Sequence, residues 1–124
     1  MNRLILPYPP SLNRAWRSGS HGVYKDSKIT AYQRHAKLEA IAAGVCEPIS
    51  GPIVLWVDLH PRQPKKATGK PARCIDLDNA MKVAVDALNG IAWLDDRQVV
   101  ELHARKGTPV PDGRLVVGWQ LVTA

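Results

Sequence analysis

The sequence predicts an α+β fold, a single-domain two-layer sandwich in which two main helices cover a mixed sheet. Residues 53–59 form a mostly apolar run rich in β-branched side chains, which is typical of a buried strand. Residues 79–88 show the apolar spacing of a helix with one buried face, and residues 99–106 and 115–122 predict two closing strands.

The helix over 79–88 has the clearest periodicity in the chain. Its apolar side chains stand at i, i+3, i+4 and i+7, namely Met81, Ala84, Val85 and Leu88. Asn89-Gly90 follows directly and favours a helix end, because glycine readily takes the left-handed conformation required there.

The N-terminal part predicts one strand and one helix. Residues 2–6 favour a short strand that ends at the prolines behind it, which cannot continue a ladder. The mixed Ser, Asn, Arg and Gly content of 11–25 indicates a loop. A helix follows to about Ala43, with Ser27 or Thr30 as its expected cap.

The segment between the strand over 53–59 and the helix over 79–88 has two parts. Residues 60–73 are rich in Pro, Gly, Lys and Arg and predict a loop. Residues 74–78 predict a short extended piece that leads into the helix. The expected order of elements is therefore β-α-β-α-β-β.

The length of 124 residues fits one domain, taken as 1–124. Cys46 and Cys74 form no C-x-x-C motif and the four histidines are scattered, so a structural zinc site is not expected. No signal peptide or run of about 20 apolar residues is visible. We therefore expect a cytoplasmic protein with no membrane partner.

The charge of +6 is unevenly distributed along the chain. Residues 1–75 carry 12 Lys and Arg against four acids, whereas residues 76–124 carry five against seven. This asymmetry suits a polyanionic partner together with a local cation site. Many small soluble proteins are also simply basic, so charge alone does not decide the function.

Two acidic clusters flank the predicted helix, at Asp76-Leu77-Asp78 and at Asp95-Asp96. Residues two apart on a strand face the same side, so we expect Asp76 and Asp78 to point together, and a returning strand can bring Asp96 beside them. Carboxylates at close range need a proton or a cation, and oxygen ligands favour Mg²⁺, with Mn²⁺ as a substitute. The sequence thus predicts a metal site at Asp76, Asp78 and Asp96.

Each acidic motif also has a purely structural interpretation. Asp76 or Asp78 could cap the helix, and Asp95-Asp96 could form a turn before the next strand. Lys82 lies four residues after Asp78 and could stabilise a phosphorane-like transition state, but it could equally join an Asp78–Lys82–Asp86 surface ladder. Asp86 is assigned to that ladder.

Polar and basic residues around the acids complete the candidate site. Asn79 could cap the helix or orient a carboxylate. The basic loop could contact DNA phosphates, although such loops are often merely solvated. The predicted nucleic-acid contacts are Arg14, Arg62, Lys65, Lys66, Lys70 and Arg73.

Four short segments, in this order along the chain, resemble those of the RusA-type Holliday junction resolvases of bacteria and their prophages. They are Pro9-Pro10-Ser11-Leu12-Asn13-Arg14, Asp76-Leu77-Asp78-Asn79 with Lys82, Asp86-Ala87-Leu88, and Trp93-Leu94-Asp95-Asp96-Arg97-Gln98-Val99-Val100. Each segment is short, but the ordered combination is specific.

The resemblance implies a homodimeric, Mg²⁺-dependent endonuclease of DNA recombination and repair that binds four-way junctions. Paired nicks of opposite polarity would leave 5′-phosphate and 3′-hydroxyl ends. The family's essential acids fall on Asp76, Asp78 and Asp96 and its helix lysine on Lys82, with Asp95 as a supporting neighbour.

Two other functions compete with a structure-selective nuclease. In a non-catalytic nucleic-acid-binding module, the basic loop would bind and the aspartates would only cap and turn. A metal enzyme acting on small phosphates is a third hypothesis, for which the basic loop is larger than the substrate requires.

Overall fold

The computed structural model of the chain describes residues 2–10, 16–19, 22–25, 27–45, 47–64 and 74–122; for 16–19 and 22–25 it describes the backbone alone. Within these ranges the protein consists of a four-stranded sheet, two helices, a 3₁₀ turn and a small two-stranded hairpin.

The main sheet has the strand order β1-β6-β4-β5. It is built from β1 (Asn2–Leu6), β4 (Ile53–His60), β5 (Val99–Lys106) and β6 (Arg114–Leu121). β6 pairs antiparallel with both β1 and β4, whereas β4 and β5 run parallel. The mixed sheet expected from the sequence is confirmed.

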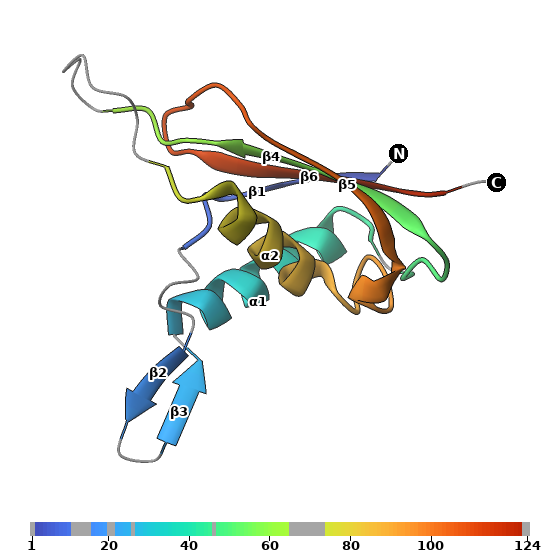
Figure 1. Cartoon of the computed structure of the whole chain (residues 1–124), viewed down its shortest axis with the longest axis horizontal. Helices are drawn as coiled ribbons and strands as arrows, with labels where there is room; N and C mark the ends of the chain where they lie inside the picture. Colours follow the sequence, from blue (N-terminus) through green and yellow to red (C-terminus); the bar gives the residue numbers. More distant parts are fainter. Residues whose placement is uncertain are drawn as a thin grey trace.

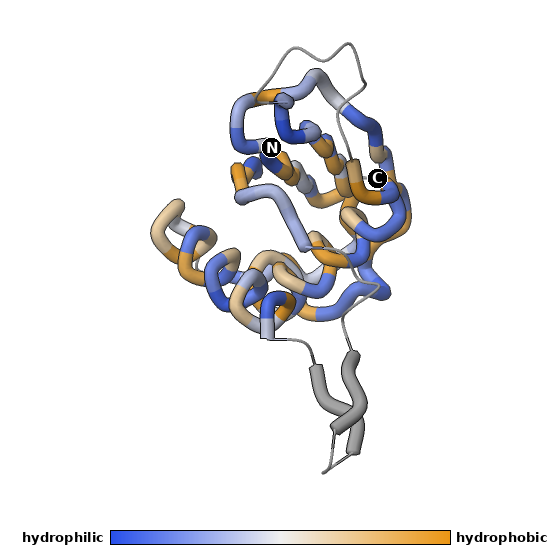
Figure 2. The backbone as a smooth tube through the Cα atoms, turned by 90° about the vertical axis from the view of Figure 1, so that its left-hand side faces the viewer, coloured by the Kyte–Doolittle hydropathy of each residue, from blue (hydrophilic) through white to orange (hydrophobic). Residues whose placement is uncertain are grey.

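Helices α1 (Ser27–Ala42) and α2 (Leu77–Leu88) lie on one face of this sheet, which gives two layers (Figure 1). Along β4 the side chains alternate between buried and half-buried, because one face meets the helices and the other does not. Figure 2 shows the same backbone turned by 90°, with apolar and polar residues both present along the strands and helices. The α+β class and the order of the main elements are confirmed.

The core lies between the sheet and the helices. Its largest fully buried side chains include both members of an edge-to-face tryptophan pair, Trp93 and Trp119, whose ring centroids are 6.1 Å apart. Four inward-facing residues of β4 are also fully buried: Ile53, Leu55, Val57 and Leu59. This packing fixes the start of the segment 93–98, which carries one of the acidic clusters.

Two N-terminal predictions are wrong. The loop expected over 11–25 contains an antiparallel hairpin of β2 (Trp16–Gly19) and β3 (Gly22–Lys25). Helix α1 already begins at Ser27, so neither Ser27 nor Thr30 stands at the capping position before its first residue.

Helix α2 begins two residues earlier than predicted, so Asp78 lies inside it rather than in an extended piece. Its buried face is also rotated from the predicted one. Met81 and Val85 are only half-buried, and the buried side chains are Ala80, Val83, Ala84, Ala87 and Leu88. The expected end at Asn89-Gly90 is confirmed, with Asn89 as the C-cap and Gly90 at φ 83°.

The pairing of β5 with β4 contains a shift of one residue at its start. Ile53 faces Val99 and the next residue, Val54, faces Glu101, which leaves Val100 without a partner on β4. A bulge of this kind bends a strand and changes the direction of the chain that leads into it. In the described part of the chain, no helix is long and apolar enough to cross a membrane.

Candidate active site

Asp76 and Asp78 stand at the N-terminal end of α2. Asp76 is the N-cap residue, with extended backbone angles of φ −63° and ψ 143°, and Asp78 belongs to the first helical turn. The prediction that both project from one face of a strand is therefore wrong. Acidic residues favour such a helix start, because the macrodipole is positive there, and this local preference extends the helix to Leu77.

The side chains of these two aspartates are exposed and have no structural task that the fold reveals. Asp76 accepts no capping hydrogen bond, which contradicts the cap interpretation for this residue. Within the described ranges, neither carboxylate forms a hydrogen bond or an ion pair. Both remain available to an external ligand.

Lys82 is exposed on α2, one turn beyond Asp78. No ion pair joins it to Asp78 or to Asp86, so the alternative of an Asp78–Lys82–Asp86 ladder is wrong. The half-buried Asn79 lies beside them in the first turn of the helix. Within the described residues, Lys82 therefore lies one helical turn from Asp78 and forms no ion pair with it.

Tyr8 holds the chain immediately before Asp76. Its hydroxyl accepts a hydrogen bond of 2.8 Å from the backbone N–H of Ile75. The guanidinium of Arg62 lies over the same ring, 4.7 Å from its centroid. Burial raises the pKa of the Tyr8 hydroxyl, so this group remains protonated at neutral pH. The ring therefore connects the first basic residue of the 60–73 segment with the start of α2.

The second acidic cluster lies in a hydrogen-bonded 3₁₀ turn, η2 (Asp96–Gln98). Asp95 is its N-cap, and its Oδ1 accepts a 3.0 Å hydrogen bond from the N–H of Arg97. The Gln98 side chain accepts in return from the N–H of Asp95, at 2.8 Å. Together these bonds form a capping box, so the turn interpretation holds for Asp95.

The two neighbouring carboxyls of this turn have opposite pKa shifts. The hydrogen bond from Arg97 N–H, followed by hydrogen bonding with Asp96, lowers the pKa of Asp95. Hydrogen bonding with Asp95 raises the pKa of Asp96, and the negative charges of Asp95 and Asp86 add to the rise. Asp96 is thus the carboxylate whose ionised form lacks compensation, which a cation would supply. Asp86, which was assigned to the ladder, instead acts on Asp96.

The described side chains do not form a closed metal cage. Among the residues that the structure describes, no three His, Cys, Asp or Glu side chains lie close enough together to hold an ion. Asp76 and Asp78 are at one end of the 12-residue helix α2, whose length is about 18 Å, and Asp96 follows its other end. The predicted convergence of all three on one ion is not formed here, because the helix separates them.

The basic residues are only partly within the described ranges. Arg62 is exposed above Tyr8, and it lines a hollow with Gln63, Pro64, Cys74 and Ile75 beside the start of α2. The other predicted DNA contacts lie outside the described residues, namely Arg14, Lys65, Lys66, Lys70 and Arg73.

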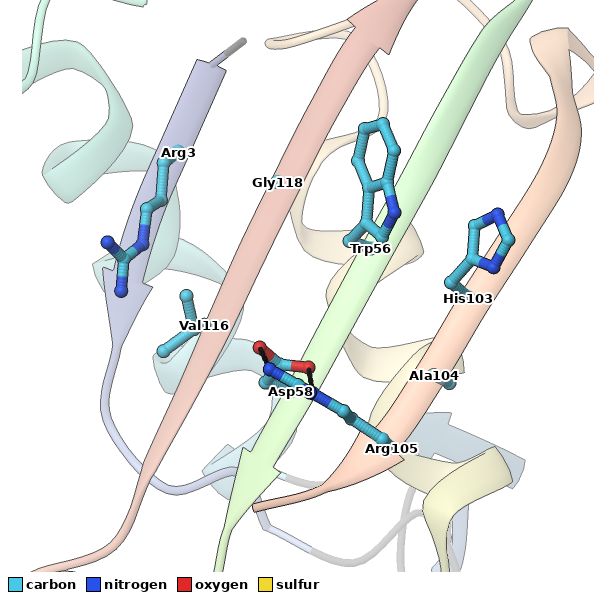
Figure 3. Close-up of a pocket in the computed structure, with 8 residues that line it drawn as sticks. All are labelled: Arg3, Trp56, Asp58, His103, Ala104, Arg105, Val116 and Gly118. Atoms are coloured by element: carbon cyan, nitrogen blue, oxygen red, sulfur yellow. Dashed lines mark hydrogen bonds and ion pairs between the residues drawn. The ribbon is translucent and has the colours of Figure 1, made fainter. Parts of the chain in front are cut away.

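The opposite face of the sheet carries a separate hollow that contains none of these acids (Figure 3). Two of its charged groups, Asp58 and Arg105, pair with each other. Arg105 Nε donates to Asp58 at 2.7 Å, and His103, stacked against Trp56, bonds Glu101 at 2.7 Å. The residues that line it are Arg3, Trp56, Asp58, His103, Ala104, Arg105, Val116 and Gly118.

Comparison with known families places these observations in context. The sequence model described as endodeoxyribonuclease RusA matches residues 7–117. The chain belongs to the RusA family. The match includes both acidic clusters, Lys82 and the whole of the connection between β4 and β5. The family and the enzyme class expected from the sequence, an endodeoxyribonuclease, are confirmed.

Individual RusA relatives align along nearly the whole chain. The crossover junction endodeoxyribonuclease RusA of Escherichia coli K12 is 29% identical over 113 residues, which cover 90% of this chain and 88% of the relative. Its counterpart in Escherichia coli O139:H28 is 30% identical over 114 residues, with the same coverage. The enzyme of Enterobacteria phage 82 is 27% identical over 113 residues, again with 90% and 88% covered.

Two residues of this candidate site were not singled out in the sequence. Gln98 could have been found, because Asp95-x-x-Gln98 is the spacing of a capping box. Tyr8 gives no such signal, since its partner Ile75 is 67 residues away.

Proposed function

We propose that the chain is a Mg²⁺-dependent endodeoxyribonuclease that resolves four-way DNA junctions in recombination and repair, acting as a homodimer. Membership in the RusA family supports this proposal, since its relatives are named crossover junction endodeoxyribonucleases. The observation that carries it is the group of Asp76, Asp78 and Lys82, exposed and unpaired in the described part of the chain. A two-fold dimer suits a substrate that needs two symmetric cuts.

Asp76, Asp78 and Asp96 are the proposed metal ligands. The donor set fits Mg²⁺, because it consists of exposed carboxylates, the oxygen ligands that this ion prefers. Asp76 has no competing capping bond, and the raised pKa of Asp96 shows that its ionised form is disfavoured without a cation. Mg²⁺ in proteins is commonly held by one or two carboxylates together with waters and substrate phosphates, so a site without three converging side chains is compatible with it. Bound Mg²⁺ supplies Lewis-acid polarisation of the phosphodiester and a more acidic water.

The remaining residues have distinct proposed roles. Lys82 donates to a phosphate oxygen and stabilises the extra negative charge that develops as water attacks phosphorus and the 3′-oxygen leaves. Asn79 and Asp95 support the two acidic segments. Arg62 and the basic residues outside the described ranges contact the DNA backbone: Arg14, Lys65, Lys66, Lys70 and Arg73.

Cleavage of a labelled four-way junction tests the proposal. We expect paired nicks in Mg²⁺ or Mn²⁺, binding without cleavage in EDTA, and little cleavage of linear duplex. Asp78→Asn should bind the junction normally and fail to cut it. Asp112→Asn changes an exposed aspartate in the turn before β6 and should cut normally. If Asp78→Asn cuts as fast as Asp112→Asn, the active site does not depend on Asp78. If the unsubstituted protein binds the junction in Mg²⁺ but does not cut it, the chain is a nucleic-acid-binding module.

The proposed DNA contacts have an independent test in the salt dependence of binding. Replacing Lys65, Lys66 and Lys70 together by Ala should weaken junction binding and reduce the slope of log K against log [salt] by up to about three, roughly one for each lost phosphate contact. An unchanged slope would show that this loop is merely solvated.

A further inference from the structure

The Gln98 side chain forms hydrogen bonds with two segments that are distant in sequence. Its Oε1 accepts from the backbone N–H groups of Leu94 and Asp95, each at 2.8 Å. Its Nε2 donates to the backbone carbonyls of Ile49, at 2.6 Å, and Gly51, at 2.8 Å. A glutamine amide offers two acceptor sites and two donors, and all four are used here.

These partners determine the orientation of the amide. Two backbone N–H groups can only donate and two carbonyls can only accept, so exchanging Oε1 and Nε2 would break all four bonds. The oxygen therefore closes the capping box of η2, and the nitrogen attaches the turn to residues 49–51. The two halves of one amide have separate tasks.

The 49–51 segment is itself firmly held. The N–H of Ile49 donates to the carbonyl of Ala92 at 2.9 Å. Gly51 has φ 148°, and a Cβ built on it would lie 2.9 Å from Cδ1 of Leu121, so β6 packs tightly against its backbone. Gln98 thus fastens the turn to a point whose position is determined by the sheet.

We propose that Gln98 is the positioning residue of the Asp96 carboxylate, holding it in place through the turn without contacting DNA or metal. The proposal rests on the proposed function, in which Asp96 is a metal ligand. Asp96 is exposed, and the interaction described for its side chain is with the neighbouring Asp95 of the same turn. Among the described side chains of η2, Gln98 makes the hydrogen bonds that tie the turn to residues 49–51, and these bonds contribute to the position of Asp96.

Two variants of the full-length protein separate the tasks of the amide. Gln98→Glu keeps two acceptor oxygens for Leu94 and Asp95, since glutamate also closes capping boxes, but it removes both donors to residues 49–51. Gln98→Ala removes all four bonds. Gln120→Glu, on an exposed side chain of β6, is the matched control for the added charge.

We expect Gln98→Glu to lower kcat for junction cleavage by about 10- to 100-fold, the range typical of residues that orient metal ligands, with KM unchanged. Mg²⁺ titration followed by the amide NMR signals of Asp96 and Asp78 gives a readout that does not depend on activity. Because Asp78 and Asp96 are proposed to hold the same ion, both signals should report one affinity for Mg²⁺, weakened about tenfold. Gln98→Ala should show the same pattern, and Gln120→Glu should match the unsubstituted protein in both readouts.

The outcomes are distinguishable. If both Gln98 variants, confirmed as folded by their NMR spectra, keep the original kcat and Mg²⁺ response at Asp96, the positioning role is wrong while the proposed function stands. Shifted amide signals along α2 in the metal-free Gln98 variants would indicate a general structural effect and would also overturn it. If the unsubstituted protein neither cleaves junctions nor responds to Mg²⁺ at Asp96, the proposed function fails, and this inference fails with it.

Discussion

The two acidic segments of this molecule are built in opposite ways. Within the described residues, the Asp76 and Asp78 carboxylates at the start of α2 make no hydrogen bond or ion pair, and the N–H of Ile75 before them donates to the Tyr8 hydroxyl. In η2, Asp95 is engaged in a capping box, and Gln98 ties the turn to a distant segment. The first two carboxylates are thus positioned mainly by the helix backbone, whereas the turn that carries Asp95 and Asp96 is also held by side-chain bonds. We therefore expect substitutions of the α2 aspartates to reduce cleavage activity without changing the stability of the fold. Substitutions in η2 should change both activity and stability.

The largest expected effect is on catalysis at α2. Asp76→Asn removes the charge but keeps the shape, and Asn is as favourable as Asp at an N-cap. We expect junction cleavage to fall by at least about 100-fold, beyond the effect of residues that only orient ligands, with Tm and junction affinity unchanged. Quantitative cleavage assays and thermal unfolding measure the two properties. If Tm falls together with activity, the expectation that substitutions at α2 affect activity without affecting stability is wrong.

The next effect is on the stability of the fold, to which the two carboxyls of the η2 segment should contribute with opposite sign: ionised Asp95 stabilises and ionised Asp96 destabilises. The pKa of Asp95 is depressed, so its ionised form stabilises the fold at neutral pH, and this contribution is lost as pH falls through the folded-state pKa. The pKa of Asp96 is raised, so its ionisation opposes folding at neutral pH, and that penalty disappears as pH falls through its raised value toward the unfolded one.

At neutral pH, Asp95→Ala should accordingly lower Tm by a few degrees, since it also removes the cap, and Asp96→Asn should leave Tm unchanged or raise it. At a pH low enough to protonate both carboxyls, the Tm of Asp96→Asn should equal that of the unsubstituted protein. Thermal unfolding monitored by circular dichroism at several pH values measures both. Shifts of the same sign would contradict the division of roles between the two residues.

The smallest expected effect concerns the hydroxyl that precedes Asp76. Tyr8→Phe removes the acceptor for Ile75 N–H and should cost about 1 kcal/mol of unfolding free energy. We expect kcat to fall less than about tenfold. Tyr32→Phe is the matched control, because it removes a hydroxyl bond to the carbonyl of Pro7 without touching the segment before Asp76. Denaturant unfolding and cleavage rates are measured for both, and equal rates would show that Tyr8 has no part in placing Asp76.

Local patterns in the sequence predicted most of the fold. The β-branched run of β4 and the Asn89-Gly90 helix end follow from strand and turn preferences that act over a few residues, and both are present. The hairpin over 16–25 was missed, because its strands have only four residues each and contain Gly, Ser and Arg, which do not mark a strand.

The candidate site was less predictable. The D-x-D spacing was interpreted as a strand, although Asp residues before and within the first turn favour a helix start equally well. The bonds of Gln98 to Ile49 and Gly51 cross 49 and 47 residues, a separation at which no local pattern carries information. The sequence thus predicted the family, which is confirmed, and proposed the acidic residues, whereas the side chains that support them required coordinates.

Val100, which has no partner on β4, sets the spacing along the chain between η2 and the regularly paired part of β5. It inserts one residue between the regular ladder and η2, and one residue of strand spans about 3.3 Å. A shift of this size is larger than the Mg²⁺–oxygen bond of about 2.1 Å that Asp96 is proposed to make. We therefore expect substitution of Val100 to preserve junction cleavage and deletion of this residue to reduce it, and we expect relatives to vary here in residue type rather than in spacing.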